Sequence, residues 1–339
     1  MSLMDSYQRF METYSDPRTA DWWMMSSPVP LLTLLVFYVY FCTSVGPRFM
    51  RDRKPFHLKH TIIGYNISQI VMSIYLVYEG LAAGWWNNYN FSCQPVDFSE
   101  TGNRMAAAVW WYFFAKVIEL MDTVFFVLRK KNRQISFLHV YHHTLMPICA
   151  WIGTKFLPGG HGTLLGVINS FIHIIMYTYY MISGLGPEYQ KYLWWKKHLT
   201  TMQLIQFCIV FYHNFSVMFR DCDYPKSLNF LLALNAGLFL YMFGNFYYQN
   251  YIKAAKKSTK VLQNGNGVNH LSNGNGSVVS KENGLTVSKR NVEAVSNGNG
   301  YIGSKQNGLN LVSKYNGAVV SNGNGFSVGN GHCVSKKEC

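Results

Sequence analysis

The chain has 339 residues, of which 49% are hydrophobic and only 14% are charged. Its formal net charge of +14 owes part of its size to lysines and arginines in an Asn-, Gly- and Ser-rich region after residue 253. A charge of this origin does not indicate nucleic-acid binding, and the sequence contains neither zinc-finger spacing nor an RNP motif. We therefore expect no nucleic-acid partner.

Seven predominantly apolar stretches precede that region. A membrane-spanning helix needs about 20 mostly apolar residues, and a buried helix of a soluble protein explains one such stretch but not seven in series. The sequence therefore predicts an all-α, polytopic membrane protein with seven transmembrane helices. The predicted spans are 28–47, 61–80, 106–128, 135–155, 163–183, 199–219 and 228–251.

Basic residues concentrate in every second loop between the predicted spans. The loops after the first, third and fifth spans and the segment after the seventh are rich in Lys and Arg, whereas the loops between them are poor in both. Loops rich in Lys and Arg face the cytosol in membrane proteins. We expect residues 1–27 to form a lumenal N-terminal segment, 28–252 the membrane domain and 253–339 a cytosolic tail.

Two of the loops predicted to be lumenal contain one cysteine each, Cys93 and Cys222. Because the lumen of the secretory pathway permits disulfides, we predict a Cys93–Cys222 bridge, with two free thiols as the alternative. Asn90 begins an Asn-Phe-Ser sequon on the same side of the membrane, which is an acceptor sequence for N-glycosylation.

The predicted span 106–128 carries three charged side chains, Lys116, Glu119 and Asp122, at successive i, i+3 positions. Each unpaired charge at the centre of a membrane helix costs about 2.5–3.5 kcal/mol on insertion scales. Three of them would offset the gain from many apolar residues. We therefore expect these side chains to pair with one another or to face a polar cavity.

The next span carries His139, His142 and His143, which share one helix face because they are spaced i, i+3 and i+4. Three chemistries suit such a cluster: ligation of a metal, as in a membrane lipid oxidoreductase; nucleophilic or general-base catalysis on an acyl group; and packing in a receptor or transporter bundle. Paired irons need several histidine boxes, and this chain has one. Counting does not exclude a mononuclear metal site that also uses His173.

Two later spans carry polar side chains at a similar depth. Asn169 and His173 are spaced i, i+4 in the fifth span, and Gln203 and Gln206 are spaced i, i+3 in the sixth. Each of them singly is also explained by hydrogen bonding between helices. At about 1.5 Å per residue, four side chains from four spans fall roughly 12–16 Å from the cytosolic ends of their helices: His142, Glu119, His173 and Gln206. We therefore expect one interior polar chamber that opens to the cytosol.

Four segments of the sequence resemble, in order and spacing, the successive motifs of the ELO family of fatty-acid elongases. The segments are Lys116-Val-Ile-Glu119-Leu-Met-Asp122-Thr123, Phe137-Leu-His139-Val-Tyr-His142-His143, Asn169-Ser-Phe-Ile-His173-Ile-Ile-Met176-Tyr177-Thr-Tyr179-Tyr180 and Thr200-Thr201-Met-Gln203-Leu-Ile-Gln206. The resemblance covers roughly residues 25–255 and includes the number of spans. The tail is not part of the pattern.

The resemblance implies a condensing enzyme of the endoplasmic reticulum membrane, a very-long-chain 3-oxoacyl-CoA synthase. Such enzymes join a long-chain acyl-CoA to malonyl-CoA and release CO2 and CoA, without a permanently bound cofactor or a metal. In the family the middle histidine of the box accepts the acyl group, which here is His142. The expected partners are the lipid bilayer, the two CoA substrates, other enzymes of the elongation cycle and a second copy of the chain.

The other polar residues of the chamber take supporting roles in this interpretation. The remaining histidines would orient the acceptor, shuttle a proton or stabilise an oxyanion, the amides would donate hydrogen bonds, and the three charged residues would form a network behind the site. The acyl chain would run toward the lumen in a tunnel between apolar spans. The expected site residues are His142, His139, His143, His173, Asn169, Lys116, Glu119, Asp122, Gln203 and Gln206.

Cations near the cytosolic ends of the spans are candidates for binding CoA phosphates, although basic loops also arise because they set the orientation of the chain. These cations are Arg129, Lys130, Lys131, Arg133, Lys196 and Lys197. The tail has too little apolar surface to offset its ordering entropy, so we expect it to be disordered. Its Lys336 and Lys337 resemble a dilysine retrieval signal for the endoplasmic reticulum.

Overall fold

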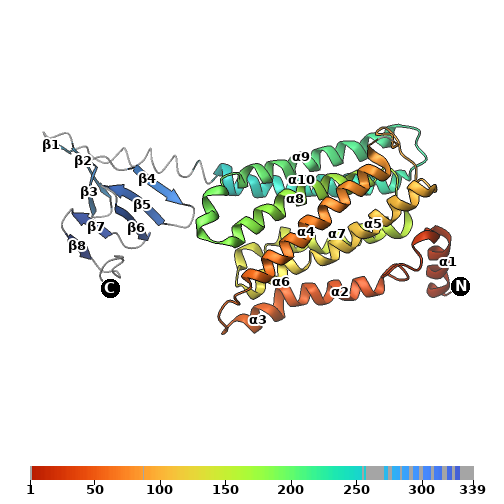
Figure 1. The fold of residues 1–339 in the computed structure, drawn as a ribbon, viewed down its shortest axis with the longest axis horizontal. Helices are drawn as coiled ribbons and strands as arrows, with labels where there is room; N and C mark the ends of the chain where they lie inside the picture. Colours follow the sequence, from red (N-terminus) through yellow and green to blue (C-terminus); the bar gives the residue numbers. More distant parts are fainter. Residues whose placement is uncertain are drawn as a thin grey trace. The chain divides into compact units, whose positions relative to one another are not determined.

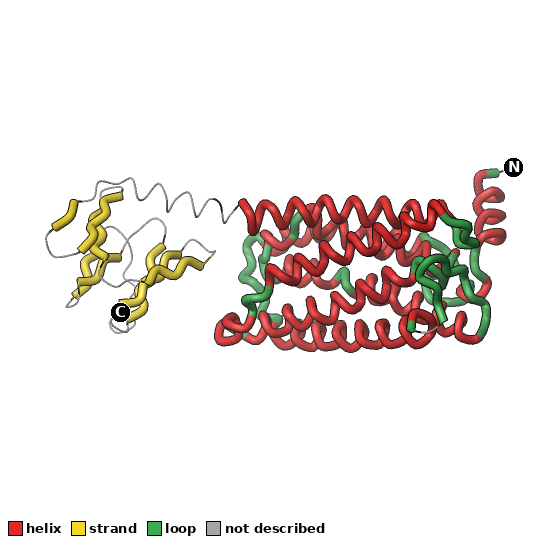
Figure 2. Tube along the Cα trace, turned by 90° about the horizontal axis from the view of Figure 1, so that it is seen from above, coloured by secondary structure: helices red, strands yellow, loops and turns green. Residues whose placement is uncertain are grey.

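The computed structural model describes residues 2–86 and 88–253, residue 256 and short segments between 271 and 328. The chain divides into two compact units, Met1–Lys253 and Ala254–Cys339. The first unit is helical, and most of its helices run lengthwise beside one another (Figures 1 and 2).

The α-helices of the first unit are α1 (Leu3–Tyr14), α2 (Val29–Tyr40), α3 (Gly46–Met50), α4 (Lys59–Gly80), α5 (Glu100–Ile118), α6 (Met121–Leu128), α7 (Phe137–Phe156), α8 (Thr163–Leu185), α9 (Lys196–Ser216) and α10 (Lys226–Tyr247). Shorter 3-10 or π segments are η1 (Pro17–Thr19), η2 (Phe41–Val45), η3 (Leu81–Trp85), η4 (Asn132–Gln134), η5 (Pro187–Tyr192), η6 (Val217–Phe219) and η7 (Tyr248–Lys253).

Among the described residues, five helices are long and apolar enough to cross a membrane. This confirms the expectation of a helical unit with several membrane-spanning helices, but the expected count of seven spans is not confirmed. The predicted spans 106–128 and 135–155 are the two that fall short. The five candidate spans are Val29–Met50, Lys59–Trp85, Thr163–Leu185, Lys196–Phe219 and Lys226–Lys253.

The two segments fall short because they are more polar than the other five. The first is also interrupted, since α5 ends at Ile118 and α6 begins only at Met121, and its charged side chains stand at or beside this break. The second, α7, is continuous over 20 residues and passes through Pro147 without ending, but three histidines occupy its first two turns. In both segments the polar residues are those that build the site described below.

Serine N-caps fix where the two site-bearing helices begin. The Ser99 hydroxyl accepts a hydrogen bond from the N–H of Gly102 at the start of α5. The Ser136 hydroxyl accepts one from the N–H of His139, at 3.2 Å, at the start of α7. Such caps satisfy N–H groups that have no partner within the helix. The cap at Ser136 thus fixes where α7 begins, close to His139, the first histidine of the box.

The helices pack in neighbouring pairs, namely α4 against α8, α9 against α10 and α5 against α7. Fully buried side chains such as Leu31, Phe113 and Tyr177 fill the space between helices, whereas large apolar side chains such as Phe37 and Tyr212 are exposed on the outside. An apolar outer surface around a helical unit suits the hydrocarbon interior of a bilayer.

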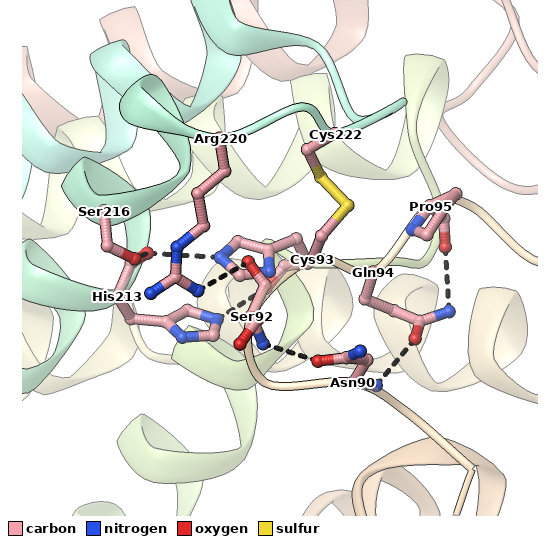
Figure 3. The surroundings of a disulfide bond; sticks show 10 residues. Asn90, Ser92, Cys93, Gln94, Pro95, His213, Ser216, Arg220 and Cys222 are labelled. Atoms are coloured by element: carbon pink, nitrogen blue, oxygen red, sulfur yellow. Dashed lines mark hydrogen bonds between the residues drawn. A yellow bond between two sulfur atoms is a disulfide. The ribbon is translucent and has the colours of Figure 1, made fainter.

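A disulfide joins Cys93 to Cys222 at one end of the helical unit, with a Cα–Cα distance of 5.6 Å (Figure 3). It ties the connection between η3 and α5 to the connection between α9 and α10, and it is the pair expected from the loops. Beside it, the rings of His161 and His213 stack with centroids 3.8 Å apart and planes at 9°. Nε2 of each ring is hydrogen-bonded to the backbone carbonyl of the other residue, at 3.2 and 3.3 Å.

The second unit contains short antiparallel strands in its described residues, where the sequence analysis predicts disorder. The strands are β1 (Leu271–Asn273), β2 (Ser277–Glu282), β3 (Leu285–Lys289), β4 (Glu293–Asn297), β5 (Tyr301–Gln306), β6 (Leu309–Lys314), β7 (Val319–Asn322) and β8 (Gly325–Val328), in the sheets β1-β2-β3, β4-β5-β6 and β7-β8. Strand-favouring valines occur in the described residues of this unit, for example in β2 and β3. The predicted retrieval signal, Lys336 and Lys337, lies outside the described residues.

Candidate active site

A buried ion pair lies where α5 ends. Nζ of Lys116 is 2.8 Å from Oε1 of Glu119, and both side chains are almost completely buried. Buried charges are tolerated when they are paired and hydrogen-bonded. Nζ of Lys116 also donates to Oδ1 of Asn169 on α8, at 2.7 Å, so the pair is anchored to a second helix.

Two polar residues of α8 complete this group. Nδ1 of His173 is 3.0 Å from Oε1 of Glu119, and the Tyr112 hydroxyl donates to Oδ1 of Asn169, at 3.0 Å. An ionised carboxylate only accepts hydrogen bonds, so His173 carries a proton on Nδ1. The oxygen of Asn169 accepts from both Lys116 and Tyr112, and its NH2 group therefore remains as the donor for another partner.

The three box histidines form a row at the start of α7. The ring centroids of His139 and His143 are 4.2 Å apart, and those of His142 and His143 are 5.4 Å apart. Nε2 of His139 lies 2.9 Å from Oγ1 of Thr123 on α6. The ring of His142 packs edge-on against Phe239 of α10, with centroids 4.9 Å apart. The box is thus held between α6 on one side and α10 on the other.

A cavity inside the helical unit begins at this group and continues toward the disulfide end. Its polar part is lined by His142, Asn169 and Gln206. At the far end it reaches Gly162 and Tyr224, whose side chain is almost fully buried. Most of the wall between is apolar and is lined by Leu76, Met105, Val109, Met146, Leu165, Phe207, Val210 and Ala236, among others. A largely apolar cavity with an imidazole and two amides in its wall suits a long apolar ligand with a reactive head.

Gln206 presents an acceptor to this cavity. Its Oε1 is buried, and among the described residues it has no hydrogen-bond partner. An unpaired buried acceptor costs about 1–3 kcal/mol. A donor group on a ligand, or a water molecule that enters the cavity, would therefore be stabilised beside Gln206.

Two of the expected site residues do not join this group. Asp122 accepts a hydrogen bond from the Tyr177 hydroxyl, at 2.8 Å, and does not extend the Lys116–Glu119 pair, so the expected network of three charges is split in two. Gln203 does not line the cavity, and its Nε2 lies 3.9 Å from Sδ of Met176. Both residues therefore have partners other than the members of the group, namely Tyr177 and Met176.

The cations considered for CoA phosphates lie outside the cavity, at helix ends on the same side as the box. Four of them, residues 129–133 without Asn132, belong to the connection from α6 to α7, and Lys196 and Lys197 begin α9. Nζ of Lys130 donates to the backbone oxygen of Arg51, at 2.9 Å, which gives that lysine a structural partner. The side chains of Lys131, Arg133, Lys196 and Lys197 are exposed.

Sequence reasoning missed three hydroxyl groups that touch the site, those of Tyr112, Thr123 and Tyr38. Tyr112 precedes Lys116 by four residues, so the helical spacing could have placed both on one face. Thr123 ends the motif that begins at Lys116, and only its position in the motif singled it out. Tyr38 stands in a uniformly apolar span, where the sequence carries no signal for its contact.

The histidine box lies beside a hydroxyl, aromatic rings and the amides of the cavity wall. Within the part of the chain that the structure describes, His, Cys, Asp and Glu side chains do not form a group of three suited to a metal ion. The box histidines instead contact a hydroxyl, an aromatic ring and one another. An imidazole on a cavity wall beside two amides combines a nucleophile with hydrogen-bond donors.

Comparison with known proteins agrees with this geometry. The GNS1/SUR4 family, ELO, matches residues 23–259. A very long chain fatty acid elongase of Aedes aegypti is 50% identical over 260 residues, which are 76% of this chain and 72% of the relative. Very long chain fatty acid elongase 7 of Drosophila melanogaster is 45% identical over 79% of this chain and 82% of its own, and very long chain fatty acid elongase 1 of Homo sapiens is 44% identical over 78% and 96%. The cavity, the histidine box and these relatives together show that the chain belongs to the ELO family of fatty-acid elongation enzymes.

Proposed function

We propose that the protein condenses a long-chain acyl-CoA with malonyl-CoA to give a 3-oxoacyl-CoA, CO2 and CoA. The observation that carries this proposal is the position of His142, where the polar end of the cavity meets its apolar wall. An acyl chain placed along that wall would bring its thioester carbonyl to the imidazole. The relatives are named very long chain fatty acid elongases, which agrees with a long apolar substrate.

In the first half-reaction the unprotonated ring nitrogen of neutral His142 attacks the thioester carbonyl. A C–N bond forms, the C–S bond breaks, and the departing CoA sulfur takes up the proton lost from the other ring nitrogen. The product is an acyl-imidazole, a covalent intermediate that divides one difficult step into two. The NH2 group of Asn169 is the donor best placed to stabilise the oxyanion, because its oxygen is already held by Lys116 and Tyr112.

In the second half-reaction malonyl-CoA loses CO2 and leaves an enolate. The enolate carbon attacks the acyl-imidazole, a C–C bond forms, the C–N bond breaks, and the imidazole regains a proton from the medium. Nδ1 of His173 lies 3.0 Å from Glu119, and this contact fixes the ring beside the group that holds Asn169. The chemistry uses the two CoA substrates and needs no resident cofactor.

The same proposal includes the topology expected from the sequence. The α5–α6 segment and α7 would cross the bilayer with the five apolar helices, shielded by them, which gives seven spans. The N-terminus would lie in the lumen of the endoplasmic reticulum and the tail in the cytosol, where basic loops face. The Cys93–Cys222 disulfide supports this orientation, because disulfides form in the secretory lumen rather than in the cytosol.

The substrates and partners follow from this placement. The exposed cations at the start of α9 and in the turn before α7 would bind CoA phosphates at the cytosolic mouth. Other enzymes of the elongation cycle would take over the 3-oxoacyl product, and a second copy of the chain is a further partner that we propose.

The test is the intact mass of the purified protein after incubation with a long-chain acyl-CoA and no malonyl-CoA. We expect an acyl adduct on the wild type, none on His142→Ala, and an unchanged adduct on the control His57→Ala, whose side chain is exposed. Added malonyl-CoA should discharge the adduct as 3-oxoacyl-CoA. Acylation that persists in His142→Ala would show that another residue is the carrier. Microsomes with His142→Ala that still incorporated malonyl units at the normal rate would favour the receptor or transporter alternative.

A further inference from the structure

A series of three hydrogen-bonded side chains leads from α2 to the histidine box. The Tyr38 hydroxyl lies 2.7 Å from Oγ1 of Thr123, and that oxygen lies 2.9 Å from Nε2 of His139. The three residues belong to three different helices, α2, α6 and α7. Tyr38 is 6% exposed and Thr123 is 0% exposed, so water does not compete for these hydrogen bonds.

Counting the hydrogen-bond donors shows in which direction Tyr38, Thr123 and His139 donate to one another. Among residues 2–253 the Tyr38 hydroxyl has no hydrogen bond other than the one to Thr123. If His139 donated from Nε2 to Thr123, one hydroxyl proton would be buried without an acceptor, which is unfavourable. It would be the proton of Tyr38 if Thr123 donated to Tyr38, or the proton of Thr123 if its oxygen accepted from both neighbours. If Tyr38 donates to Thr123 and Thr123 donates to Nε2, both buried hydroxyl donors are satisfied, and Nδ1 of His139 is not among the buried unpaired atoms of the described residues. His139 is then neutral and carries its proton on Nδ1.

The orientation of His139 influences the proposed nucleophile, His142, through contacts between their rings and that of His143. Its ring centroid is 5.2 Å from that of Phe126 and 4.2 Å from that of His143. His143 in turn lies 5.4 Å from His142. A rotated or protonated His139 would therefore change both the packing and the charge beside His142.

We propose that Tyr38 and Thr123 are positioning residues that act in series to hold His139 in one orientation and in its neutral, Nδ1-protonated form. Thr123 contacts His139 directly, and Tyr38 acts only through Thr123. The inference rests on the proposed function insofar as the box carries the acyl transfer. It also gives α2, which the sequence marks only as an apolar span, a part in the site.

The first test uses substitutions that differ only in the hydroxyl. Thr123→Val keeps the shape and removes the hydroxyl, and we expect the rate of acyl-adduct formation on His142 to fall about tenfold, since one buried hydrogen bond of this kind contributes about 1–1.5 kcal/mol. Thr123→Ser keeps the hydroxyl and should stay within about twofold of the wild type. The melting temperatures of both variants should agree, which separates positioning from general loss of structure.

The second test is a double-mutant cycle. Tyr38→Phe alone should slow the adduct by about threefold to fivefold, because the direction of the Thr123 donor is then less constrained. Combined with Thr123→Val it should add nothing, since the residue through which it acts is already gone. If the two fold-reductions in rate multiplied in the double variant, Tyr38 and Thr123 would act independently. That result would overturn the proposal that they act in series.

The third readout does not depend on catalysis. Diethyl pyrocarbonate modifies an unprotonated imidazole nitrogen, so peptide mapping by mass spectrometry should show faster modification of His139 in Thr123→Val than in Thr123→Ser or the wild type. A wild type without acyl adduct would refute the proposed function while leaving this comparison intact. Equal modification in all three proteins would refute the positioning of His139.

Discussion

Two groups of histidines lie toward opposite ends of the helical unit, and they differ in what their nitrogens touch. In the chamber, His139 and His173 bond to side chains, those of Thr123 and Glu119. At the disulfide end, His161 and His213 bond to each other's backbone carbonyls. Side-chain partners can change protonation or position during a reaction, whereas backbone carbonyls are fixed acceptors. The comparison teaches that the partners, more than the residue type, separate reactive from structural histidines.

The largest expected effect is on the chamber side. His142→Ala should lower condensation by about 10³-fold or more, because the nucleophile is removed while the cavity remains. Release of CO2 from labelled malonyl-CoA, measured per mole of folded protein, provides the rate. If the same loss followed from His161→Ala with unchanged stability, the division into reactive and structural histidines would be wrong.

The second-largest expected effect concerns the buried ion pair between Lys116 and Glu119. Lys116→Met leaves Glu119 buried without its cation, and we expect the free energy of unfolding to fall by about 3–5 kcal/mol. The double variant Lys116→Met/Glu119→Gln removes the stranded charge and should recover much of that loss. Thermal unfolding in detergent measures both, and a double variant no more stable than the single one would contradict the pairing seen here.

The next prediction concerns the Cys93–Cys222 disulfide, at the end of the helical unit that holds His161 and His213. Replacing Cys93 and Cys222 by Ala should lower the free energy of unfolding by about 2–4 kcal/mol. The acyl adduct per folded molecule should be retained, because the bond contacts neither box nor ion pair. Cys208→Ala, at an exposed free cysteine, is the matched control and should change neither quantity.

The stacked pair gives a smaller effect. His213→Leu removes one reciprocal hydrogen bond and the ring contact with His161, and we expect a loss of about 1–3 kcal/mol in unfolding free energy. Activity per folded molecule should stay near that of the wild type. A stable His213→Leu protein with no acyl adduct would instead place the pair within the reactive machinery.

The smallest effect concerns pH and lies outside the candidate spans. Hydrogen bonds from the Ser99 N–H and hydroxyl lower the pKa of Asp97 from its usual value of 3.8. Because the folded-state pKa is below the unfolded one, the stabilisation is present above pH 3.8 and is lost as the pH falls through the folded-state pKa. Asp97→Asn should therefore reduce the acid dependence of the melting temperature below about pH 4, and an identical acid dependence in both proteins would refute this linkage.

Much of this arrangement could be predicted because membrane helices obey strong one-dimensional rules. Length and hydropathy located the apolar helices, and the rise per residue placed Glu119 and His173 at one depth, where the structure puts them 3.0 Å apart. Spacing along one helix does not identify which side chain of another helix will be the partner. That is why Asp122 and Gln203 were expected in the group and instead contact Tyr177 and Met176.

The contacts that escaped prediction depend on tertiary structure or on competing local signals. Tyr38 looks like any aromatic residue in an apolar span, and its bond to Thr123 exists only because α2 and α6 meet. The break between α5 and α6 was hidden because the same charges that mark it were interpreted as part of one span. In the tail, low hydrophobicity indicated disorder, while strand-favouring valines lie in the strands that the structure describes.

The separation in sequence between Lys116 and Asn169 has a consequence for how the protein is made. Their hydrogen bond joins residues 53 positions apart, so Lys116 leaves the ribosome well before its partner on α8 exists. Until α8 arrives, the charged end of α5 must wait near the polar surface of the membrane or in the translocation machinery. Completion of the chamber is thus a late event in biosynthesis, and variants that weaken α8 should expose the α5–α6 segment to quality control before any effect on catalysis is seen.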